Sequence, residues 1–154
     1  MSEVEIRIVD PSADDIVALL EEHMADMVVT SPPESRHALD LEGLCAPDVT
    51  FWAGRIRGDL AVIGALKALD PAHGEIKSMR TSTHFKRMGL AQNMLDHILH
   101  SAKQDGMARV SLETGSMEYF EPARRLYERS GFEYCPPFGS YVLDPYSVFM
   151  TKSL

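Results

Sequence analysis

The residues between Ile76 and Leu95 include four basic side chains and no acidic one, in a chain whose formal net charge is -8. Two of the four flank a glycine at a predicted strand-to-helix turn, which reads Lys86-Arg87-Met88-Gly89-Leu90-Ala91. The first N–H groups of a helix have no partners within the helix, and with the helix dipole they favour an anion. Gly89 has no Cβ, so an oxygen atom can approach the main chain there. The turn therefore suits a pyrophosphate, and an ordinary basic helix start with a surface glycine is the alternative.

Apolar periodicity predicts the elements that position this turn. Alternation indicates a half-buried strand over 3–9, with Val4, Ile6 and Ile8 on its buried face. The spacing of Ile16, Leu20, Met24 and Met27 indicates a helix that ends near Val29. A hairpin with its turn at Gly58-Asp59 is expected over 49–57 and 60–69, after a short helix over 37–44. The remaining elements are strands over 75–81, 108–113, 132–135 and 147–152, and helices over 87–105 and 119–130.

The composition narrows the class of protein. A length of 154 residues with 45% hydrophobic and 25% charged side chains is typical of one globular domain, 1–154. A pI near 5.2 argues against nucleic acid or an anionic membrane as a partner, because both need a broad basic face. Cys45 and Cys135 have no metal-ligand spacing, and the histidines show none either, so no metal is expected. The acidic N-terminus is unlike a signal peptide, which leads us to expect a cytoplasmic protein.

Two motifs together resemble the GCN5-related N-acetyltransferase (GNAT) family. The first is Lys86-x-x-Gly89-x-Ala91 after the strand that contains residues 75–81, and the second is Ala123-x-x-Leu126-Tyr127-x-x-x-Gly131-Phe132. The resemblance covers roughly residues 3–152 in element order. It implies an α+β, three-layer α/β/α fold, in which a central mixed sheet of about seven strands is splayed between strands four and five.

The resemblance also implies acetyl-CoA as the cosubstrate and a set of residues that hold it. The first motif would hold the pyrophosphate, with Lys86 where the family usually has Gln or Arg. Backbone groups of Met79, Arg80 and Thr81 would pair with the pantetheine arm and orient the thioester carbonyl, much as a strand is added to a sheet edge. Phe120 stands where family members often have Asn, which puts one coenzyme contact in doubt. Arg124 could reach a phosphate or the adenosine end, or it is a solvated helix residue.

Acetyl transfer to an amine needs a neutral amine, support for the oxyanion and a proton for the departing thiolate. Tyr127 matches the family's proton donor to the thiolate, and its alternative role is that of a core aromatic. Glu75 and Glu113 are the candidate bases, and each could instead be a solvated strand charge. A water relay or simple desolvation of the amine would need neither carboxylate.

The acceptor is expected to be a primary amine of a small molecule. The segment around Glu34, Arg36 and His37 would lie over the acceptor side, although each of these residues read singly is an ordinary surface or capping residue. A peptide or protein N-acetyltransferase is one alternative function, and a non-catalytic acyl-CoA-binding regulatory module is another. A homodimer formed through a sheet edge is a further expectation.

Overall fold

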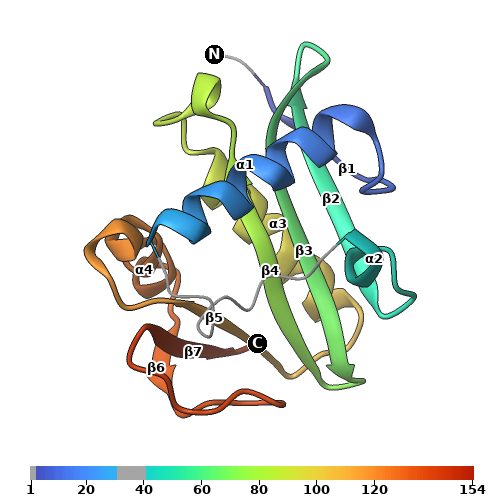
Figure 1. The fold of residues 1–154 in the computed structure, drawn as a ribbon. Helices are drawn as coiled ribbons and strands as arrows, with labels where there is room; N and C mark the ends of the chain where they lie inside the picture. Colours follow the sequence, from blue (N-terminus) through green and yellow to red (C-terminus); the bar gives the residue numbers. More distant parts are fainter. Residues whose placement is uncertain (1–2, 31–40) are drawn as a thin grey trace.

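The computed structural model describes residues 3–30 and 41–154 (Figure 1). The elements follow the predicted order: β1 (Glu5–Ile8), α1 (Asp14–Thr30), α2 (Leu41–Leu44), β2 (Val49–Ile56), β3 (Asp59–Asp70), β4 (His73–Thr81), α3 (Leu90–Gln104), β5 (Arg109–Gly115), α4 (Glu121–Arg129), β6 (Glu133–Cys135) and β7 (Ser147–Ser153). Short 3-10 helices cover Thr83–Phe85 and Glu118–Phe120. No helix within the described ranges is long and apolar enough to cross a membrane.

The strands form one 7-stranded sheet in the order β1-β2-β3-β4-β5-β7-β6. Neighbouring strands are antiparallel except β4 and β5, which pair in parallel through His73–Ile76 and Arg109–Leu112. This parallel pair ends while both strands continue, so the expected mixed sheet splayed between its fourth and fifth strands is confirmed.

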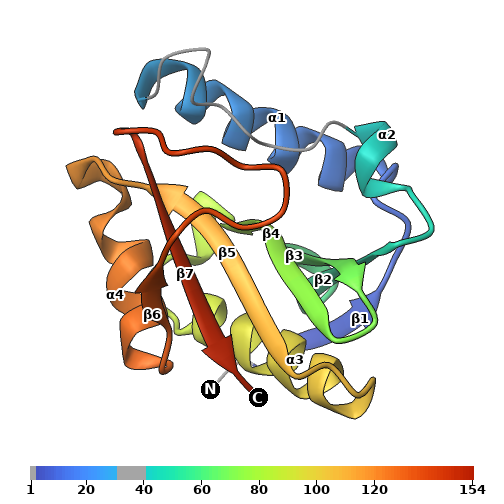
Figure 2. The same cartoon turned by 90° about the horizontal axis from the view of Figure 1, so that it is seen from below.

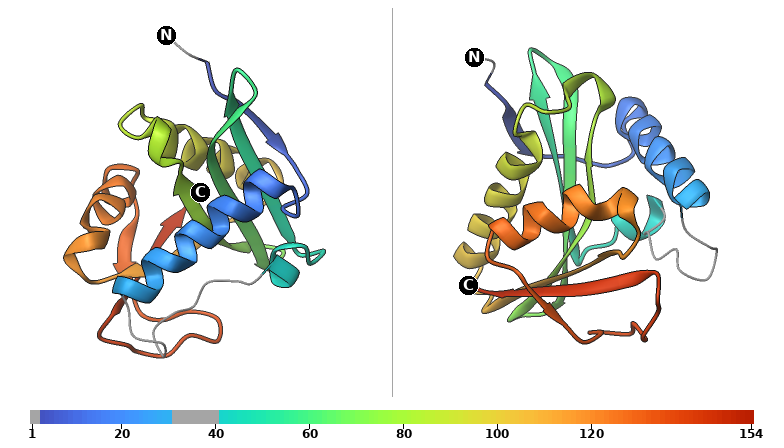
Figure 3. Two further views of the ribbon diagram at one scale, coloured as in Figure 1. Left: turned by 45° about the horizontal axis from the view of Figure 1, so that its top comes forward. Right: turned by 90° about the vertical axis from the view of Figure 1, so that its left-hand side faces the viewer.

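Helices cover both faces of the sheet, as Figure 2 shows, with α1 and α2 on one face and α3 and α4 on the other. The right-hand view of Figure 3 shows the strands lying between α1 and α3. A stripe on α3 (Leu90, Met94, Leu95, Ile98, Ala102) packs against one face of the sheet together with Leu126 and Tyr127 of α4. Ile16 and Leu19 of α1 and Leu44 of α2 pack against the other face, on Phe51, Ala53, Ile63 and Ala65. Helix α3 therefore buries an apolar stripe, as the periodicity predicts. On α1 the prediction holds only in part, because Ile16 is buried and Leu20 is half-buried, while Met24 is 38% exposed.

Three local expectations were wrong. Ile8 was expected on the buried face of the first strand, but the residue is 69% exposed because β1 is an edge strand that ends there. The hairpin turn is made by Arg57 and Gly58, which have φ of 53° and 85°, and Asp59 already belongs to β3. The helix expected from residue 87 begins at Leu90, because Arg87 and Gly89 have left-handed backbone conformations that a helix cannot contain.

A β-bulge interrupts β4 at Ser78, whose φ is 58°. Opposite it, Ala65 pairs with Lys77 and Ile63 pairs with Arg80, so β4 has one residue more than β3 over this interval. The extra residue shifts the alternation of side chains. Met79 consequently packs toward α3, while Arg80 reaches α1 on the face that Lys77 shares.

Candidate active site

The candidate site follows β4 along the edge where it leaves β5. Beyond Ile76 no residue of β4 pairs with β5, although β4 continues to Thr81. Backbone groups on this edge are therefore open to a ligand chain that pairs with them as an added strand. Met79, Arg80 and Thr81, which the resemblance assigns to the pantetheine arm, all lie on this part of β4.

The anion turn, residues 86–91, lies beyond the end of that edge. Arg87 has a φ of 65° and Gly89 a φ of 74°, and α3 starts at Leu90 without a side-chain cap. Nothing lies within 4 Å of the position that a Cβ on Gly89 would take. Lys86 and Arg87 are exposed. An uncapped helix start, open space and two exposed cations fit a pyrophosphate.

The other two basic residues of the acid-free window do not serve this turn. Arg80 donates to Glu22 Oε1 of α1 at 2.6 Å, and Lys77 Nζ lies 3.1 Å from Glu75 Oε2. Acidic residues from outside the window thus neutralise half of its positive charge. The local positive field is concentrated at Lys86 and Arg87.

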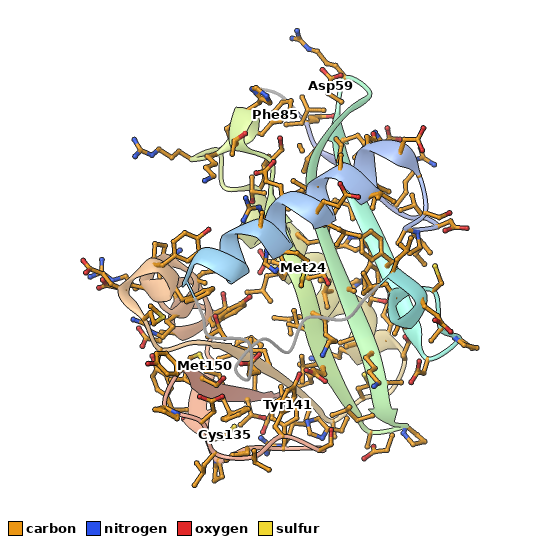
Figure 4. All side chains as sticks on the ribbon, in the orientation of Figure 1. Met24, Asp59, Phe85, Cys135, Tyr141 and Met150 are labelled. Carbon is orange, nitrogen blue, oxygen red and sulfur yellow. The ribbon has the colours of Figure 1, made fainter. Side chains whose placement is uncertain are left out.

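A hydrogen-bonded cluster on β4 joins Glu75, Lys77 and Tyr141. The Tyr141 hydroxyl donates to Glu75 Oε2 at 2.6 Å, and Lys77 Nζ donates to the Tyr141 oxygen at 2.9 Å. Glu75 is 4% exposed and the side chain of Lys77 is 9% exposed. Figure 4 places Tyr141 at the opposite end of the molecule from Phe85, which precedes the anion turn. The two polar regions therefore lie at the two ends of β4.

Glu113, the second candidate base, is half-buried on β5, just past the last residue that pairs with β4. Its Oε2 accepts a hydrogen bond from the Ser147 hydroxyl at 2.6 Å. Burial is the main cause that raises the pKa of Tyr141 above its ordinary range, followed by the negative charge and hydrogen bond of Glu75 and by the charge of Glu113. Both candidate carboxylates thus disfavour ionisation of the Tyr141 phenol.

Tyr127 lies on α4 and is 6% exposed. Its ring meets Phe132 edge to face, with 5.6 Å between the ring centroids. Burial raises the pKa of Tyr127 to about 12, so the phenol keeps its proton at neutral pH. Tyr127 is thus part of the core, as its alternative role requires, and it is also protonated, as an acid must be.

Two residues expected near the coenzyme also contribute to the local structure where β5 ends. Arg124 Nη1 donates to the carbonyl oxygens of Gly115 and Met117, at 2.7 and 2.8 Å. A Cβ on Gly115 would overlap the Phe120 ring, which shows how closely that ring covers the backbone.

Sequence reasoning missed the contribution of Tyr141 and Lys77. Lys77 was noted only as part of a basic window, and no motif marks Tyr141, which lies between β6 and β7. Glu34, Arg36 and His37 lie outside the described residues. Within the described ranges, no three His, Cys, Asp or Glu side chains are grouped so as to hold a metal ion.

Comparison with known proteins points to one family. The model of the acetyltransferase (GNAT) family matches residues 16–132. The chain is 54% identical over 149 residues to the uncharacterized N-acetyltransferase YsnE of Bacillus subtilis, an alignment that covers 97% of this chain and 99% of the relative. It is 35% identical over 159 residues to an IAA acetyltransferase of Azospirillum brasilense, and 100% of each chain is covered.

Solved structures share the fold. A GNAT family acetyltransferase from Elizabethkingia anophelis, with acetyl-CoA bound, superposes with a TM-score of 0.68 and 14% sequence identity. The superposition covers 98% of both chains.

Proposed function

Since this chain belongs to the acetyltransferase (GNAT) family and is an acyltransferase, we propose that it transfers the acetyl group of acetyl-CoA to a primary amine of a small molecule by direct attack on the thioester. The observation that carries the proposal is the arrangement along β4. An anion turn lies at one end of its open edge and a buried carboxylate at the other. At a rise of about 3.3 Å per residue, residues 75–81 span roughly 20 Å, which suits an extended donor.

The donor would bind by two kinds of contact. Backbone N–H groups at the start of α3 would receive the pyrophosphate, with Lys86 and Arg87 as flanking cations. Backbone groups of Met79, Arg80 and Thr81 would pair with the pantetheine arm. Bound there, acetyl-CoA supplies an activated acyl carbon and a thiolate leaving group.

The bulge at Ser78 would support the oxyanion. A residue inserted into a ladder leaves backbone groups without cross-strand partners, and such groups are available to a developing negative charge. The bulge lies between the anion turn and Glu75, so an acyl group held there would be close to the proposed base.

Glu75 would remove a proton from the acceptor ammonium, so that the nitrogen lone pair can form the new N–C bond. Tyr127 would then give its proton to sulfur as the C–S bond breaks. The nitrogen of the new amide would lose its second proton, and a proton taken up from solvent would restore the phenol. Glu113 is the alternative base, and it lies on β5 at the same end of the site. The acceptor would be drawn by the net charge of -8 and by these carboxylates, both of which favour a cationic amine.

The test measures thiol release from acetyl-CoA with a panel of amino acids, polyamines, aminoglycosides and short peptides, and mass spectrometry identifies the acetylated product. We expect at least one small amine to be acetylated with a higher kcat/KM than any peptide. Higher values for peptides would replace the small-molecule acceptor with a peptide. Binding of CoA without thiol release for any amine would favour a regulatory module instead.

A further inference from the structure

We infer that Tyr141 and Lys77 are positioning residues, which hold one oxygen of Glu75 so that the other oxygen receives the proton of the acceptor amine. This inference rests on the proposed role of Glu75 as the base. It adds two residues that neither family motif contains, and it assigns separate tasks to the two carboxylate oxygens.

The hydrogen bonds to Glu75 are asymmetric. The Tyr141 hydroxyl and Lys77 Nζ both donate to Oε2, at 2.6 and 3.1 Å. Lys77 also donates to the Tyr141 oxygen, at 2.9 Å, so the three groups form a closed ring of contacts. Oε1 accepts no hydrogen bond from any residue that the structure describes. A carboxylate held by one oxygen has a fixed direction in which the other oxygen can take a proton.

The aromatic side chains around Tyr141 fix the position of its hydroxyl. The centroid of the Tyr141 ring lies 5.3 Å from that of Phe138 and 5.5 Å from that of Phe149. Lys77 Nζ lies 5.6 Å from the centroid of the Tyr141 ring. Burial raises the pKa of Tyr141, so that the phenol stays protonated and continues to donate to Oε2. The segment between β6 and β7 thus contacts β4 through the Tyr141 side chain, whose position is fixed by its neighbours.

Other titratable groups near the cluster have their own partners. Glu113 accepts from Ser147, and its charge acts on Tyr141. His73 precedes Glu75 by two residues on β4, and its Nε2 lies 2.6 Å from the Ser111 hydroxyl. The direct donors to Glu75 in the described structure are therefore Lys77 and Tyr141.

The proton transfer breaks an N–H bond of the acceptor ammonium and forms an O–H bond on Oε1. The charge of the ammonium and that of the carboxylate disappear together, while Lys77 keeps its positive charge. A change that removes a donor from Oε2 weakens the anionic form of the base, so the base is protonated at a higher pH.

The experiment compares wild type with Tyr141→Phe, Lys77→Met, Glu75→Gln and the double variant Glu75→Gln/Tyr141→Phe. The assay is thiol release with the panel amine that wild type acetylates fastest, over a range of pH. Tyr141→Phe keeps the ring contacts and loses only the hydroxyl. We expect it to lower kcat about 10- to 100-fold with little change in KM, and to move the acidic limb of the pH–rate profile to higher pH. Lys77→Met should move that limb in the same direction.

The matched control is Tyr134→Phe. The Tyr134 hydroxyl donates to Glu128 Oε2 at 2.6 Å, the same length as the Tyr141 contact, but both residues are exposed and lie on β6 and α4. This variant should keep wild-type kcat and the wild-type pH profile.

The double variant separates the two possible failures. If Tyr141 acts through Glu75, the double variant is no slower than Glu75→Gln alone. If Tyr141→Phe slows the Glu75→Gln protein as much as it slows wild type, or has no effect on wild type, the positioning role is wrong while the base assignment stands. Full turnover by Glu75→Gln would overturn the base assignment and the positioning role together.

Discussion

Replacing Gly89 by alanine tests whether the anion turn binds the pyrophosphate. A Cβ at this position meets no atom within 4 Å, so the substitution causes no steric clash in the free protein. The φ of 74° is the only obstacle, and a left-handed conformation costs an L-residue about 1–2 kcal/mol. Because the turn from Lys86 to Gly89 is exposed, it can relax in the variant when no ligand is bound.

Binding must then restore the original turn, so the strain appears in the affinity. We expect the dissociation constant for CoA to rise about 5- to 30-fold, which corresponds to 1–2 kcal/mol. Isothermal titration calorimetry with CoA measures this change without an acceptor. Urea denaturation should show little loss of stability.

Gly106→Ala is the matched control at the other end of α3. Gly106 has a φ of 86° and likewise has nothing within 4 Å of the Cβ position. It follows Asp105, the C-cap residue of α3, and its N–H donates to the Lys103 carbonyl. The strain should therefore lower the free energy of unfolding while CoA affinity stays at the wild-type value. Wild-type affinity in Gly89→Ala, or equal losses of affinity in both variants, would refute the assignment of the turn.

Three further predictions follow from particular contacts. Tyr127→Phe should lower kcat for thiol release about 10²- to 10⁴-fold without changing CoA affinity, and an unchanged kcat would remove the acid role. Burial raises the pKa of Tyr127 to about 12, while an unfolded phenol ionises near 10, so the wild-type fold should lose stability as the pH rises from about 10 to 12. Urea denaturation midpoints should fall less over this pH range in Tyr127→Phe than in wild type. In Gly115→Ala the new Cβ would overlap the Phe120 ring, so urea denaturation should show an unfolding free energy lower by about 1–3 kcal/mol. An unchanged unfolding free energy would mean that the ring moves aside freely.

Much of the fold follows from patterns within short stretches of the sequence. Helix and strand periodicities predict all of the strands and the long helices, since the burial of one face is a property of residues a few positions apart. The lack of a side chain at Gly89 likewise marks the turn before α3. The two family motifs carry the same kind of local information, which is why they indicate the acetyltransferase family without any long-range contact.

The tertiary structure decided which side chains contact the proposed base, Glu75. Glu75 and Tyr141 are 66 positions apart, and their hydrogen bond depends on the segment between β6 and β7 reaching β4. The bulge at Ser78 has no glycine to mark it, yet it sets which side chains face α1. Contacts of this kind depend on strand register and on the splay of the sheet, which are set by packing over the whole chain. The sequence by itself thus determined the elements, the turn at Gly89 and the family, while the three-dimensional packing determined the surroundings of the proposed base.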